Sequence, residues 1–319
     1  MLSARRGEPP VAREVWVASV SAAGVVEDTS VVAHPADPLI DAFRCLELEG
    51  GELLIVGRAR SGAIVALQSD GGAWEAALVL GAGGYEVQVH ELARLRDGRF
   101  VAVGAKELKG FVVLFDPTTH TAHWRDWEGG AGASLIVDAK PGDDSLTICG
   151  LEAESPGELL SSSSTVFVAS LDGSGSVRRT ASMPGRACRL LAGMGPEERI
   201  RMLHEGVETV PGPLHLLELD ETLETAAERQ LLGEIFHFYL LKSAESAESF
   251  AVLNQRPVRE SIEVFAIASG LLLGSSRLGV FPTGDMDIVA FGGDYLVISQ
   301  PLAAETARRT PRIDFFDVP

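Results

Sequence analysis

A short apolar run recurs about every fifty residues along this chain. The copies are strand-like in pattern, as in ELLIVG (52–57) and RFVAVG (99–104). Six copies occur, and their last residues are 46 to 54 positions apart: Gly57, Gly104, Gly150, His204, Asn254 and Gln300. Self-similarity at a fixed period is typical of architectures in which one small unit stacks on copies of itself, so this repeat constrains the fold more than any single motif.

Each repeat carries the pattern of four short strands. A second apolar run follows the first, as in FVVLFD (111–116). A tight turn precedes the pair of runs, as at Arg96-Asp97-Gly98 in the second repeat, and another follows it, as at Leu171-Asp172-Gly173 in the third. Asp-Gly and Gly-Gly supply the positive φ angles that hairpin turns need. The runs are only about six residues long and rich in Val, Ile and Phe, which argues against a helical solenoid. A two-sheet sandwich does not explain six copies of one four-strand order.

The pattern therefore predicts an all-β, six-bladed β-propeller with four antiparallel strands per blade. One four-stranded sheet cannot cover its own two apolar faces, whereas stacked blades cover each other. We expect one domain over 1–319, with a flexible N-terminus at 1–12. Ring-closing strands are predicted at 13–33, and blades are predicted to start near residues 43, 89, 134, 187, 235 and 285. The fifth blade is expected to open with the strand FHFYLL (236–241).

Closure of the ring is the least regular part of the pattern. No fourth-strand pattern follows IDFFDV (313–318), while VWVASV (15–20) repeats the third-strand pattern ahead of the first blade. We therefore expect the last blade to be closed by N-terminal strand(s), which removes exposed sheet edges. VVEDTSVV (25–32) is the natural fourth strand, and VWVASV is an extra or a competing third strand. The sequence leaves the choice open.

One blade resembles a known repeat family. Residues 111–124 read FVVLFDPTTHTAHW, which is similar to the kelch repeat: an apolar strand ends in an aromatic-Asp-Pro turn, and Trp124 follows on the next strand. The double glycine of that repeat is reduced to the single residues Gly57, Gly104 and Gly150. The resemblance implies a divergent kelch-like propeller, and it contributes shape rather than function.

Charge and composition exclude several function classes. The 319 residues include 45 acidic and 27 basic ones, for a net charge of −18. This balance argues against nucleic-acid binding, which needs a positive face.

No apolar run reaches the roughly 18 residues that span a bilayer. The N-terminal residues lack the apolar core of a secretory signal. Three cysteines without CxxC spacing indicate reduced, buried thiols, and four lysines against 23 arginines suggest a GC-rich genome, so we expect a bacterial cytoplasmic protein.

Motifs that carry chemistry are sparse. His120 and His123 are three apart, so on one strand they point to opposite faces and share no metal easily. Asp285 and Asp287 share a strand face, but calcium takes six or more oxygen ligands. His237, inside an apolar run, is expected to be a hydrogen-bonded core or channel histidine. Neither a nucleophile elbow, a zincin helix nor a dinucleotide fingerprint occurs. We predict no catalytic residue, no metal and no cofactor.

The loops between second and third strands carry the functional prediction. They vary in length and charge: 58–62, 105–110, 151–165, 205–213, 255–261 and 301–312. Variable loops on a rigid scaffold are where binding residues concentrate. The predicted function is a non-catalytic protein-binding or scaffold subunit of a larger bacterial assembly, with a protein partner and a preference for basic ones because of the net charge. The candidate binding residues are Arg58, Arg60, Lys106, Lys109, Glu205, Arg256 and Arg259.

Two alternatives remain open. The first is a carbohydrate-active or other small-molecule enzyme with its site at the mouth of the central channel, which predicts convergent acids or a bound metal. The second is a lectin-like module, for which Tyr85 and Trp74 are the plausible exposed aromatics. Metal analysis of the purified protein separates the enzyme from the scaffold.

Overall fold

The computed structural model is built of β-strands, with one 3-10 turn at Pro156–Glu158 and no α-helix in the part of the chain it describes. It describes residues 15–316 except for gaps at 22–25, 33–38, 71–72, 75–77, 83–86, 130–131, 143–144, 160, 162, 192–198, 238–239, 256–259, 279–282, 292–293 and 302–311. The predicted flexible segment 1–12 lies outside these residues. Contacts divide the chain into two compact units, one chiefly Glu27–Leu159 with Phe167–Ser182 and the other chiefly Met183–Pro319.

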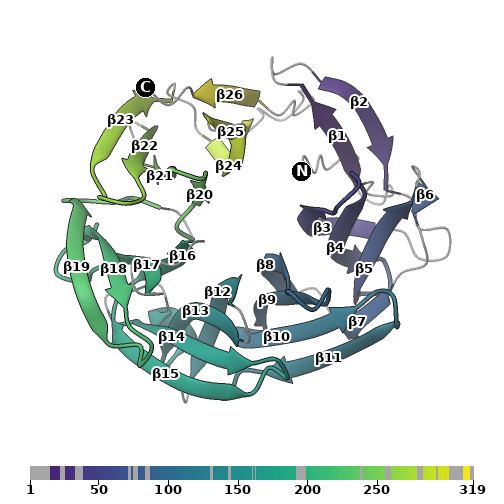
Figure 1. Cartoon of the computed structure of the whole chain (residues 1–319), viewed down its shortest axis with the longest axis horizontal. Helices are drawn as coiled ribbons and strands as arrows, with labels where there is room; N and C mark the ends of the chain where they lie inside the picture. The colour runs from purple at the N-terminus through teal and green to yellow at the C-terminus, as the bar shows by residue number, and fades with distance from the viewer. Residues whose placement is uncertain are drawn as a thin grey trace. The chain divides into compact units, whose positions relative to one another are not determined.

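The first unit contains three antiparallel sheets whose strands follow chain order (Figure 1). The first sheet has β3 (Leu39–Glu47), β4 (Leu53–Ala59) and β5 (Ala63–Asp70), with β6 (Ala73–Trp74) and β7 (Leu78–Ala82) both pairing with β5. The second has β8 (Val87–Arg94), β9 (Phe100–Lys106), β10 (Lys109–Asp116) and β11 (Thr121–Asp126). The third has β12 (Ala133–Pro141), β13 (Ser145–Ala153), β14 (Thr165–Asp172) and β15 (Val177–Pro184). The first strands of neighbouring sheets contact each other, β3 with β8 and β8 with β12.

The second unit repeats this arrangement. Its sheets are β16 (Ala187–Leu191), β17 (Ile200–Glu205), β18 (Leu214–Leu219) and β19 (Thr225–Leu232); then β20 (Ser243–Glu245), β21 (Ser249–Gln255), β22 (Glu260–Ala266) and β23 (Leu272–Arg277); then β24 (Thr283–Phe291), β25 (Asp294–Pro301) and β26 (Arg312–Phe316). The described residues therefore hold one sheet for each of the six sequence repeats, in the predicted strand order.

The two N-terminal strand patterns pair with each other. β1 (Trp16–Val20) and β2 (Val26–Val31) form a two-stranded sheet. In the described residues the last sheet consists of β24, β25 and β26. The joining of 13–33 to the last blade therefore stays a prediction.

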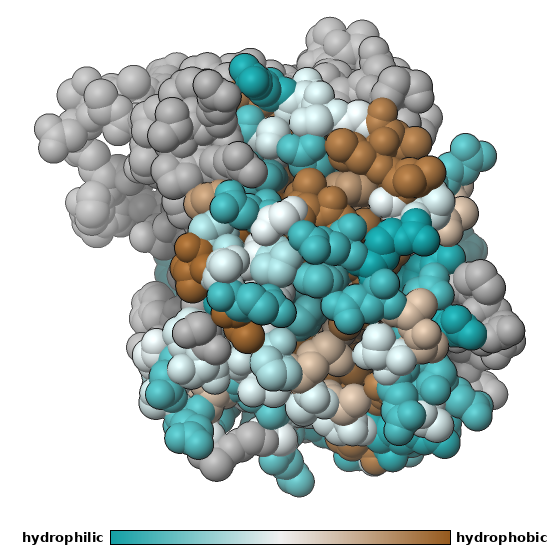
Figure 2. Space-filling view, turned by 90° about the vertical axis from the view of Figure 1, so that its left-hand side faces the viewer, coloured by the Kyte–Doolittle hydropathy of each residue, from teal (hydrophilic) through white to brown (hydrophobic). Residues whose placement is uncertain are grey.

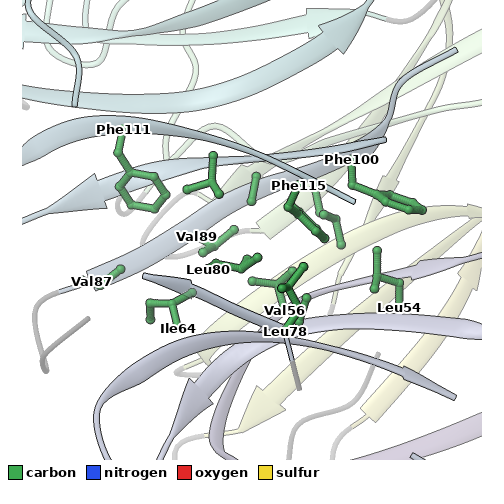
Figure 3. Packing of buried hydrophobic residues seen from close by; sticks show 14 residues of the cluster. Leu54, Val56, Ile64, Leu78, Leu80, Val87, Val89, Phe100, Phe111 and Phe115 are labelled. Atoms are coloured by element: carbon green, nitrogen blue, oxygen red, sulfur yellow. The ribbon is translucent and has the colours of Figure 1, made fainter. Parts of the chain in front are cut away.

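Burial on both faces explains why the middle strands are apolar at nearly every position. In β9, Phe100 and Ala102 pack toward the preceding sheet, and Val101 and Val103 pack toward the following one. Figure 3 shows the first of these clusters, where Phe100 and Phe115 of one sheet lie close to Val56 and Leu78 of the other. Both faces of this middle strand are thus covered by neighbouring sheets, as expected for stacked sheets that bury each other.

The outer strands have the opposite character. β19 is exposed along its first six residues, and β15 is exposed along most of its length. On the side shown in Figure 2, which includes the region of β19 and β23 in Figure 1, hydrophilic side chains cover most of the coloured surface. Hydrophobic side chains gather there only in separate patches.

The single glycine that ends the first apolar run in three repeats has a steric cause. A Cβ at Gly57, Gly104 or Gly150 would meet a backbone carbonyl oxygen of the adjacent first strand at 2.5, 1.9 or 2.1 Å, on Asp41, Gln88 and Leu135 respectively. In each of these sheets the first strand carries a β-bulge next to the glycine. The bulge pushes the backbone toward the second strand, and only a residue without a side chain fits.

Aspartates at the ends of third strands shape the turns that follow: Asp116 and Asp172 are the last residues of β10 and β14, and Asp220 directly follows β18. Asp172 Oδ1 accepts hydrogen bonds from the N–H groups of Ser174 and Ser176 at 2.8 and 3.0 Å. Asp116 and Asp220 accept equivalent bonds from Thr118 and Thr222. Hydrogen bonds from neighbouring hydroxyl groups lower the pKa of all three carboxyls. The aspartate of the kelch-like motif is therefore, in this structure, a turn-forming residue.

The fifth sheet differs from its sequence prediction. The pattern predicts FHFYLL (236–241) as the first strand, but that strand is Ser243–Glu245. The Phe236 N–H donates to the side-chain oxygen of Asn254 at 3.1 Å, and Gln255 N–H donates to the Phe236 carbonyl at 2.8 Å. At Phe236, individual bonds to the end of β21 thus take the place of a regular ladder; residues 238–239 lie outside the described part of the chain.

Candidate functional site

Two of the predicted binding residues occupy the same place in the repeat. Arg58 and Glu205 each directly follow the last residue of the first apolar run, in the first and fourth repeats. Arg58 is 8% exposed and forms an ion pair with Asp41, its cross-strand neighbour on β3. The pair ties the first strand to the second at the end of the sheet where the second-to-third connection begins. Its charge is directed into the protein.

Glu205 performs the same task with the opposite charge. It is 1% exposed and pairs with Arg186, which directly precedes β16. Its Oε1 also accepts the Gly212 N–H at 3.0 Å, and its Oε2 lies 2.5 Å from Nε2 of His237. One carboxylate thus holds the first strand, the loop after β17 and the segment before β20. His237 is hydrogen-bonded inside the protein, in agreement with its sequence interpretation.

The connection between β9 and β10 is much tighter than expected. The sequence pattern predicts a loop at 105–110, but Lys106 and Lys109 are cross-strand partners, so Glu107 and Leu108 alone form the turn. Both have positive φ angles, 51° and 58°. Two-residue hairpin turns with two positive φ angles favour Asn, Asp and Gly. A leucine in this conformation is strained by about 1–2 kcal/mol.

The turn is fixed to the neighbouring sheet of the same unit. The Leu108 carbonyl accepts the Ser134 N–H at 2.8 Å, and the Ser134 hydroxyl accepts the Gly110 N–H at 2.8 Å. The Lys109 ammonium donates to the Gly132 carbonyl. Leu108 nevertheless keeps 37% of its surface exposed. We call residues 106–109 the KELK turn: a rigid projection that presents an apolar side chain between two lysines.

The other candidate cations differ in position. Arg60 lies exposed in the short connection between β4 and β5. Arg256 and Arg259 lie outside the described residues. The structure therefore brings Lys106 and Lys109 together, places Arg60 on the surface of the same unit, and buries Arg58 and Glu205.

The buried histidine at the end of β17 predicts a pH dependence. His204 Nε2 donates to the Pro184 carbonyl at 2.9 Å, and burial lowers the pKa of the ring. Its Nδ1 is buried and has no hydrogen-bond partner among the residues that the structure describes. The unfolded chain then binds more protons than the folded one as pH falls below about 6.5. Stability should fall from pH 7.5 to pH 5.5, and His204→Gln should reduce that fall. Urea denaturation of both proteins at the two pH values measures it, and an unchanged fall contradicts this role.

The described residues offer neither a metal centre nor a membrane-spanning helix. Across the described chain, no group of three or more His, Cys, Asp or Glu side chains is arranged to hold a metal ion. Asp287 is exposed, with its carboxylate 3.8 Å from the ammonium of Lys242, and the side chain of Asp285 is not among those described. No helix of the described residues has the length and hydrophobicity needed to cross a membrane.

Sequence reasoning missed Leu108, Asp41 and Arg186. Glu-Leu contains none of the residues that favour a two-residue turn, so the KELK turn had no local signal. Asp41 and Arg186 read as ordinary surface charges. Their partners, Arg58 and Glu205, occupy the same position of the repeat. A search for an opposite charge on or beside the first strand of the same repeat would have found both pairs.

Comparison with known proteins identifies the fold. No protein-family model matches the sequence, and no curated protein matches it significantly. The WD40 domain of Toxoplasma gondii coronin is similar in structure, with a TM-score of 0.54 and 10% identity over 83% of this chain and 66% of that one. A mutant of AofleA from Arthrobotrys oligospora, in which three arginines are replaced by alanine, has a TM-score of 0.53 and 12% identity over 88% of this chain and 83% of that one.

A third similar structure is Hsv2 of Kluyveromyces lactis, with a TM-score of 0.51 and 11% identity over 83% of this chain and 71% of that one. Together with the six sheets, these likenesses show that the chain is an all-β propeller. At this level of identity they show the fold alone.

Proposed function

We propose that this protein is a non-catalytic binding or scaffold subunit that contacts a protein partner through the face carrying the second-to-third strand connections. The KELK turn is the centre of that contact. Arg60 of the same unit, and Arg256 and Arg259 by their place in the sequence repeat, are further candidate contacts, while Arg58 and Glu205 hold the bases of the loops. The kelch-like ancestry, the bacterial source and the cytoplasmic location expected from the sequence are part of this proposal.

One observation carries the proposal. Leu108 is an apolar side chain held at a positive φ angle on an exposed turn, where glycine would be less strained and leave no apolar surface in water. Strain at a rigid, exposed position is an indication of function when the surroundings enforce it, as the bonds to Ser134 and Gly132 do here. An apolar side chain that is already held rigidly loses little conformational freedom when a partner buries it.

Charge reversal tests the contact surface. Lys106→Glu/Lys109→Glu should reduce partner capture by at least ten-fold when tagged protein is incubated with a lysate of the source organism and bound proteins are quantified by mass spectrometry. Arg256→Glu/Arg259→Glu should reduce it to a smaller extent. Arg178→Glu/Arg179→Glu changes the charge equally on the exposed strand β15 and is the matched control. Equal capture by the lysine variant and the control contradicts the proposed surface.

A further inference from the structure

A groove lies at the opposite end of the second and third sheets from the KELK turn, where the hairpin turns of these two sheets meet. One part has a volume of about 160 Å³ and is lined by Leu95 and by the buried side chains of Leu114 and Leu146. A neighbouring depression shares Arg99, Leu114 and Gly173 with it and adds five residues of β11 and the β14–β15 turn: Ala122, His123, Trp124, Arg125 and Ser174. The two parts form one groove within the first unit.

The carboxylates of this groove already have partners. Asp97 accepts hydrogen bonds from Arg99 Nε at 2.8 Å and pairs with its Nη2 at 2.6 Å. Asp172 accepts the Ser174 and Ser176 N–H groups and the Ser174 hydroxyl, and these bonds lower the pKa of its carboxyl. Both acids are therefore engaged in the turns that build the groove.

Arg125 is different. It is exposed, its Nη1 donates to the Ser176 hydroxyl at 3.1 Å, and it has no ion-pair partner in the described part of the chain. His123, two residues earlier on β11, lines the same depression and has no hydrogen-bond partner among the described residues. Gly175 has a φ of 79°, and a Cβ there would lie 3.2 Å from Leu114 Cδ1 and 3.6 Å from Arg125 Cδ, so a side chain would crowd both. The groove thus keeps a guanidinium and an imidazole available beside its leucine side chains.

We propose that this groove binds a small phosphate monoester. The phosphate lies against Arg125 and His123, and the carbon part of the ligand extends toward Leu95, the partly exposed leucine of the groove. The Ser174 hydroxyl already donates to Asp172, so the two donors are the guanidinium and the imidazole. A phosphate monoester carries a charge of about −1.5 to −2 at pH 7, whereas a carboxylate carries one negative charge, so the phosphate gains more from the guanidinium. The net charge of −18 does not prevent this, since at 0.1 M salt charges beyond about 10 Å are screened and the local cations dominate.

Titration calorimetry of the intact protein with phenyl phosphate tests the site. We expect saturable binding at 0.1 M salt, weaker binding of inorganic phosphate because it lacks the apolar part, and weaker binding of benzoate because its carboxylate carries less negative charge than a phosphate monoester. Arg125→Gln should raise the dissociation constant at least ten-fold. Arg178→Gln removes the same charge from exposed β15, outside the groove, and should change it less than two-fold.

Each result decides the proposal. Loss of binding in Arg125→Gln but not in Arg178→Gln supports it, and His123→Gln should then weaken binding as well. Three results overturn it: no saturable heat with phenyl phosphate, equal losses in both arginine variants, or benzoate binding as tightly as phenyl phosphate. Thermal unfolding of each variant shows whether the fold is retained. The site is independent of the KELK turn, so failure here leaves the proposed protein contact intact.

Discussion

Gly104→Ala should destabilise the protein by about 3 kcal/mol or more, or prevent it from folding. The new Cβ would lie 1.9 Å from the Gln88 carbonyl oxygen, and backbone cannot move aside as a flexible side chain can. Overpacking in a core costs about 1–3 kcal/mol, and contact with backbone belongs at the upper end or beyond. Urea denaturation followed by circular dichroism measures the loss.

Gly157→Ala is the matched control. Gly157 lies in the 3-10 turn, and a Cβ there meets nothing within 4 Å. We expect its effect to stay within about 0.5 kcal/mol, as is usual for surface substitutions. Similar stabilities for the two variants would show that the first strand does not approach Gly104 as the bulged register requires.

Glu205→Gln should cost about 3–5 kcal/mol. The substitution leaves the Arg186 guanidinium buried without a counter-charge, and breaking one side of a buried ion pair has costs of this size. The amide oxygen can still accept the Gly212 N–H, while the amide NH2 group takes the place of Oε2 opposite His237, so the loss reports the charge together with the His237 contact. The free energy of unfolding in urea is the measurement.

The double variant Arg186→Met/Glu205→Gln should recover most of that loss, because it leaves no buried charge from the pair. Asp41→Asn and Arg58→Met/Asp41→Asn repeat the experiment at the equivalent position of the first repeat. If the double variants are as unstable as the single ones, the two pairs do not act as the proposed anchors of the loops.

The repeat predicted most of the fold because burial on two faces leaves a direct trace in the sequence. β9 and β10 were both visible as runs in which nearly every residue is apolar, and the described sheets follow the predicted order. FHFYLL failed because its apolar pattern is that of a strand, whereas the side chain of Asn254 takes a place in the hydrogen bonding. The spacing of apolar residues predicts which side chains are buried. It does not predict which group forms hydrogen bonds with the backbone N–H and C=O groups.

The candidate site was less predictable for a related reason. Arg58 and Glu205 are charged residues in variable loops, a pattern that predicts a binding surface, but each has a buried partner distant in sequence. Leu108 is apolar and was given no role, although its exposure and its φ of 58° single it out. Ion pairs between strands and backbone strain both depend on three-dimensional register, which composition and spacing do not carry.

The double variant Glu107→Asn/Leu108→Gly separates stability from binding and tests the proposed contact most directly. Asn-Gly suits two positive φ angles, so the protein should become more stable by about 1 kcal/mol. The turn keeps its shape and both lysines but loses the exposed leucine, so partner capture should fall at least ten-fold. A more stable protein that still captures its partner at the wild-type level would contradict the assignment of the KELK turn as the centre of the binding surface.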